Sequence, residues 1–129
     1  MFLPAAVKGN VVPWEKMPCT SMTTEVGMTM YMSNGMLTKA VGTTKPEYIC
    51  MERHANPIPA STPIHVIPVT PDVIFETTAS ASMTSVKPGN KVTIATDALR
   101  VTGTTTDGVA TVVALDGTAT GSVVRVCFK

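Results

Sequence analysis

Threonine and valine are the residue types that most constrain the fold of this chain. Of its 129 residues, 21 are Thr and 17 are Val. Both are β-branched, so they lose side-chain freedom in a helix and pack well on a pleated sheet. Ten prolines and nine glycines interrupt the chain at short intervals, which is typical of short strands joined by turns. The sequence therefore predicts an all-β fold, as a small single-domain β-barrel or sandwich.

The charge balance argues against two classes of partner. Lys and Arg together number 10 and Asp and Glu 9, which leaves a net charge of +1. A nucleic-acid-binding protein needs a basic stripe, and a polybasic membrane anchor needs a basic cluster. The apolar runs are also far shorter than the roughly 18 residues that span a bilayer. We therefore expect neither nucleic acid nor a membrane as a partner.

Cysteine usage and the N-terminus bear on the folding compartment. Cys19, Cys50 and Cys127 are an odd number and contain no C-x-x-C pair, which argues against a disulfide framework or a zinc knuckle. Residues 1–8 lack the basic start and the sustained apolar core of a signal peptide. Both observations favour reduced thiols and folding in a cytosolic compartment.

Residues 1–18 differ from the rest of the chain, because large apolar side chains and three prolines are scattered through them without a clear period. Proline removes a hydrogen-bond donor and is excluded from the middle of a sheet. We therefore expect an extended N-terminal arm over 1–18 and a β-barrel-like domain over 19–129. The arm either folds back on its own domain as a lid or edge strand, or docks on another protein. In the second case the contact candidates are Phe2, Leu3, Val7, Val11, Val12 and Trp14.

From Val26 to Ser33 apolar and polar residues alternate, which predicts a strand. Asn34 and Gly35 follow at once, and this dipeptide favours the type I′ turn of a hairpin, so 36–41 is expected to return as the partner strand. Pro-rich residues 53–63 predict an extended surface connection. Further strands are expected at 48–51, 64–69, 73–77, 91–95, 99–102, 109–115 and 122–128, and a short helix at 78–83.

Candidate chemistry is sparse. Met28, Met30 and Met32 share one strand face and could present thioethers to Cu(I), but flexible apolar side chains also fill irregular cores. We interpret them as core or subunit-interface residues, with a Met-rich copper protein as a third alternative. His54 and His65 lack the spacing of a metal motif and are expected to be solvated or locally hydrogen-bonded. No nucleophile elbow or phosphate loop occurs, so we predict no enzyme, no cofactor and no metal site.

Two stretches of the sequence resemble one family. The run from Asn34 to Met51 resembles the hairpin-and-loop region of small capsid decoration proteins of tailed bacteriophages, particularly those infecting Gram-positive gut bacteria. Residues 107–110, 116–119 and 125–128 resemble the closing hairpin of the same group. The likeness covers most of the chain from Leu3 onward, and it rests on the order and texture of the residues rather than on a catalytic motif.

The resemblance implies a compact β-barrel or β-tulip domain that folds in the host cytoplasm and sits on the outer surface of the capsid. Such a cement protein clamps subunits of the major capsid protein together and stabilises the head. The resemblance also implies a homo-oligomer, with a trimer favoured and a monomer as the alternative. The proline-studded stretch 53–63 and the many methionines depart from the lambda-like members of the group.

A receptor- or carbohydrate-binding β-module of the tail-fibre or adhesin type is the second alternative. Sugar-binding platforms need exposed aromatic rings, and the candidates in this chain are Trp14, Tyr31 and Tyr48. This small number favours the decoration protein over the sugar-binding module.

Overall fold

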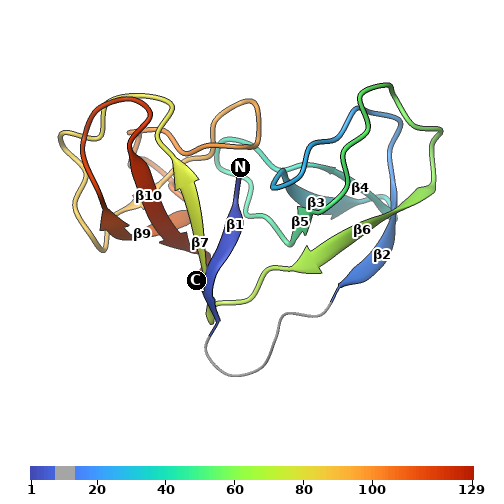
Figure 1. Cartoon of the computed structure of the whole chain (residues 1–129), viewed down its shortest axis with the longest axis horizontal. Coiled ribbons are helices and arrows are strands. Elements are labelled where there is room, and N and C mark those ends of the chain that lie inside the picture. The colour runs from blue at the N-terminus through green and yellow to red at the C-terminus, as the bar shows by residue number, and fades with distance from the viewer. Residues whose placement is uncertain (8–13) are drawn as a thin grey trace.

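The computed structural model describes residues 1–7 and 14–129, and in this part of the chain the regular elements are ten strands, with no helix. Five strands form an open sheet in the order β1-β7-β10-β9-β8, and the other five close into a barrel in the order β2-β4-β3-β5-β6 (Figure 1). The open sheet contains β1 (Leu3–Val7), β7 (Val73–Thr78), β8 (Lys91–Val92), β9 (Ala110–Leu115) and β10 (Val123–Cys127). The barrel contains β2 (Glu15–Cys19), β3 (Thr29–Ser33), β4 (Met36–Lys39), β5 (Tyr48–Cys50) and β6 (Thr62–Pro68). The predicted all-β class is confirmed.

Turn chemistry places the β3–β4 hairpin as predicted. Asn34 and Gly35 have φ angles of 50° and 77°, the left-handed values that a type I′ turn requires at both central positions. They connect β3 to its antiparallel partner β4. Asp107, with φ 53°, lies in the turn that precedes β9. These positive φ values explain why Asn, Asp and Gly occupy the turns, since other side chains are strained there.

The expected N-terminal arm is divided between the two sheets. β1 is the edge strand of the open sheet and pairs with β7, while β2 pairs along its whole length with β6 in the barrel. The amide of Phe2 donates a hydrogen bond of 2.8 Å to the carbonyl of Gly27. The described residues of 1–18 therefore belong to the fold of this chain, as edge strand and barrel strand, and residue 19 is no structural boundary. Pro4 is tolerated because β1 is an edge.

Segment 78–83 was predicted to be a short helix, and that prediction is wrong. The amide of Ala79 donates to the carbonyl of Ser122 at 3.0 Å, and the amide of Ser80 donates to the carbonyl of Val101 at 2.8 Å. Since neighbouring segments accept these hydrogen bonds, the amides are not available for helical ones. The expected strand at 99–102 is reduced to isolated bridges at Val101.

Two apolar cores share the interior. The core of the open sheet contains the three phenylalanines, Phe2, Phe75 and Phe128, with Phe128 ring centroids 5.8 Å from each of the other two. The barrel strands contribute Ile49 and Ile67 to this same core, so the barrel and the open sheet pack as one body.

The barrel interior holds the methionine row. Met28 and Met30 are 3% and 0% exposed, and Met32 is partly buried against the same cluster. Packing inside the barrel accounts for the period-two spacing of these residues. Cys19 and Cys50 lie in the same core, and they are free and buried, as is Cys127.

Candidate functional site

An exposed tryptophan stands on the outer surface of the barrel. Ile64 and Val66 on β6 are fully buried inside the barrel, so His65 between them points outward. Trp14, which immediately precedes β2, lies beside this histidine with the ring centroids 6.0 Å apart and the rings inclined at 63°. The indole keeps 59% of its surface exposed. Burying such a side chain against a partner is a large source of binding free energy.

A carboxylate holds His65 in place beneath the indole. The amide of His65 donates to Oε1 of Glu52 at 2.9 Å, and Nδ1 of the same imidazole also contacts Oε1. Nε2 of His54 donates to Oε2 of Glu52 at 2.7 Å. The carboxylate therefore joins two histidines that lie eleven positions apart in the sequence, and we call Glu52, His54 and His65 the histidine–carboxylate cluster.

The pKa of Glu52 is lowered by the cluster. Burial of the carboxyl group acts in the opposite direction and raises the pKa, but the hydrogen bonds from His54 and from the backbone and side chain of His65 outweigh it. Glu52 is therefore ionised at neutral pH. Its backbone is held too, because its carbonyl accepts hydrogen bonds from Thr24 Oγ1 at 2.8 Å and Cys50 Sγ at 3.1 Å.

This geometry suits a rigid platform. Both carboxylate oxygens of Glu52 are occupied by the two histidines, and within residues 1–7 and 14–129 no group of three or more His, Cys, Asp or Glu side chains is arranged to hold a metal ion. Hydrogen bonds that immobilise a supporting side chain reduce the entropy lost when a partner binds. The cluster therefore fixes the surface on which Trp14 rests.

The other contact candidates differ in their exposure. Phe2 is fully buried, so its place is in the core and it offers no surface to a partner. Leu3 is 39% exposed on the open sheet. The backbone of Val7 belongs to β1. Val11 and Val12 lie outside the described residues.

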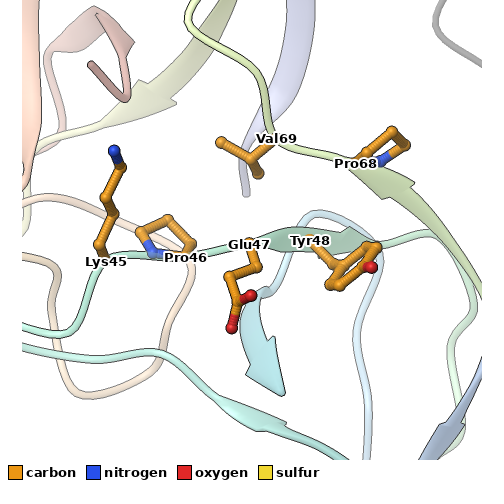
Figure 2. Close-up of a pocket in the computed structure, with 6 residues that line it drawn as sticks. All are labelled: Lys45, Pro46, Glu47, Tyr48, Pro68 and Val69. Carbon is orange, nitrogen blue, oxygen red and sulfur yellow. The ribbon is translucent and has the colours of Figure 1, made fainter.

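An open pocket of about 490 Å³ lies where β5 and the end of β6 meet. Figure 2 shows Lys45, Pro46, Glu47 and Tyr48 along one side and Pro68 and Val69 on the other. The amide of Val69 donates to the carbonyl of Glu47 at 2.9 Å and closes the ladder there. Burial and the nearby carboxylates of Glu15 and Glu47 raise the pKa of Tyr48, so its hydroxyl remains a hydrogen-bond donor at neutral pH.

Trp14 was a contact candidate from the sequence, but the contact of Glu52 with His65, which lies beside the indole, was not predicted. Glu52 and His54 are two residues apart, a spacing that could have suggested a shared strand face, but His65 reaches the carboxylate only through the pairing of β5 with β6. No helix in the described residues is long and apolar enough to cross a membrane. No protein-family model matches the chain, and no curated protein matches it significantly.

Proposed function

We propose that this protein is a structural decoration protein of a tailed bacteriophage, which binds the outer surface of the capsid and stabilises contacts between major capsid protein subunits. The observation that carries the proposal is the exposed Trp14, 59% accessible on the barrel and seated on His65. An aromatic anchor on a rigid platform is characteristic of a protein-binding surface.

The resemblance of residues 34–51 and 107–128 to decoration proteins selects the partner. Residues 34–51 contain the β3–β4 turn, β4 and β5, and residues 107–128 contain β9 and β10. Each copy that binds the assembled shell but not its free subunits shifts the equilibrium towards the shell. A lattice offers many identical sites, so modest affinity at each is sufficient when neighbouring copies also touch.

The proposal is tested by co-sedimentation with expanded heads assembled without this protein. The Trp14→Ala variant should lose most of its binding, while Trp14→Phe, which keeps an aromatic ring, should retain more of it. Circular dichroism of both variants controls for folding. Wild-type occupancy by Trp14→Ala would show that the barrel surface is not the contact, and failure of the wild-type protein to bind would refute the function itself.

A carbohydrate-binding module is the second candidate, and the pocket in Figure 2 favours it. The half-buried ring of Tyr48 offers an apolar face, while Lys45 and Glu47 offer a hydrogen-bond donor and an acceptor for hydroxyl groups. A glycan array separates the two candidates. Binding of the wild-type protein that disappears in Tyr48→Ala but persists in Trp14→Ala would favour the sugar-binding module.

A further inference from the structure

The outer face of the open sheet carries an apolar surface with an ion pair at its centre. Leu3 on β1 and Val113 on β9 are 39% and 40% exposed. A hollow of about 500 Å³ lies between the strands, lined by Ala5, Ile74, Glu76, Val113, Ala114 and Arg125. Exposed apolar side chains that gather around a hollow and are rimmed by polar residues often mark an interaction site. We call this surface the outer sheet face.

Strand pairing places four of these residues in one row across the sheet. Leu3 pairs with Glu76, Glu76 pairs with Arg125, and Arg125 pairs with Ala114. Directly paired residues point to the same side of a sheet. From β1 to β9 the row therefore contains a large apolar residue, an acidic residue, a basic residue and a small apolar residue. Nε of Arg125 lies 3.4 Å from Oε2 of Glu76, and both side chains are nearly half exposed, at 46% and 45%.

This row is complementary to itself. Consider two copies packed face to face about a two-fold axis that lies above the sheet, parallel to the strands and midway between β7 and β10. Each residue of one copy then lies opposite the residue of the second copy that is equally far from the axis on its other side. Glu76 of each copy then faces Arg125 of the other copy, and the bulky Leu3 faces the small Ala114. An isologous interface requires this self-complementarity, in which one patch serves both subunits.

The edge of the sheet is less suited to association than its face. In β1 the pairing register shifts between Pro4 and Ala6, and Pro4 offers no amide hydrogen. Proline and irregularities of this kind protect edge strands against addition of another strand. The outer sheet face has no such protection, and its two opposite charges cancel, so two copies meet without repulsion.

We propose that the outer sheet face binds a second copy of this chain, face to face about a two-fold axis, with Glu76 and Arg125 exchanging partners between the copies. The contact is independent of the proposed capsid contact, because Trp14 lies on the barrel and this face lies on the open sheet.

Charge reversal tests the proposal by sedimentation velocity. The wild-type protein should be a dimer at about 100 μM, a concentration well above a micromolar Kd. Glu76→Arg alone and Arg125→Glu alone should each sediment as monomers, because each places like charges opposite one another. An equimolar mixture of the two variants should form dimers again, since one copy then carries two basic residues and the other two acidic ones.

The matched control is Arg53→Glu on the barrel. It breaks an exposed ion pair of the same kind, in which Nε of Arg53 lies 3.2 Å from Oε2 of Glu25, so it should leave the dimer unchanged. Melting curves establish that every variant is folded. A wild-type protein that is monomeric or trimeric, single variants that still dimerise, or a mixture that stays monomeric would overturn the proposal.

Discussion

Replacing Phe2 with Ala tests whether the N-terminus belongs to the core of the protein. The Phe2 side chain is fully buried, and its ring centroid lies 5.8 Å from that of Phe128. Burying a phenylalanine side chain contributes about 1.5–3 kcal/mol, and an aromatic pair adds about 0.5–1.5 kcal/mol. We therefore expect the free energy of unfolding to fall by about 3 kcal/mol, within the usual range for Phe→Ala in a core.

Urea unfolding measures this change. With a slope of about 1.5 kcal/mol per molar for a small domain, the midpoint should fall by about 2 M. Leu3→Ala is the matched control, measured at a protein concentration at which the chain is monomeric. Leu3 adjoins Phe2 but is 39% exposed, so its truncation should lower the free energy of unfolding by no more than about 1 kcal/mol. Equal and small effects of the two substitutions would refute the placement of Phe2 in the core and would indicate that the N-terminus lies at the surface.

Three further predictions follow from local geometry. Gly27→Ala should destabilise the protein by about 2 kcal/mol or more, because φ of Gly27 is +85° and an added Cβ would lie 2.8 Å from the amide nitrogen of Phe2. Gly35→Ala should destabilise it less, because Gly35 has a similar φ of +77° but open space around it. Equal melting temperatures of the two variants would contradict this. Met30→Asp should prevent folding, since it buries an unpaired charge at a fully buried position, and a folded variant with an unchanged melting temperature would place Met30 outside the core. The pKa of Glu52 lies below its ordinary value of 4.5, so the ionised carboxylate stabilises the folded state above pH 4.5, and this contribution is lost as the pH falls through the lower folded-state pKa. Glu52→Gln should therefore flatten the pH dependence of the free energy of unfolding below pH 4.5. An unaltered acid profile would contradict the pairing of Glu52 with the two histidines.

Local sequence signals predicted most of the strands, because side-chain alternation and turn residues act over a few positions. The alternation before Asn34 and the turn at Gly35 located the β3–β4 hairpin. In β10 the same alternation places Val124 and Val126 in the core and Arg125 between them at the surface. These features depend on neighbouring residues alone.

The division into a barrel and an open sheet could not be predicted, because it depends on which distant strands pair. The prolines made this harder, since proline in a run argues against a strand. Pro18 of β2 lies directly opposite Pro63 of β6. The amide of His65, two residues further along β6, points away from β2 towards Glu52. Alternate residues share that orientation in an antiparallel ladder, so the two prolines cost the β2–β6 ladder no hydrogen bond.

Some of the surface residues were also identifiable from the sequence, and others were not. Trp14 was identified from the sequence because it is the single tryptophan of the chain and lies among prolines. The exposure of Val113 was not foreseen, because it depends on the irregularity between Arg125 and Val126 in the pairing of β10 with β9. A bulge of this kind redirects a side chain that simple alternation would place elsewhere.

Electron microscopy of expanded heads mixed with the purified protein would show whether the barrel binds the capsid. We expect added density on the outer capsid surface, with the barrel facing the major capsid protein and Trp14 in the contact. Bare heads at saturating protein, or density in which the barrel surface around Trp14 faces solvent, would contradict it.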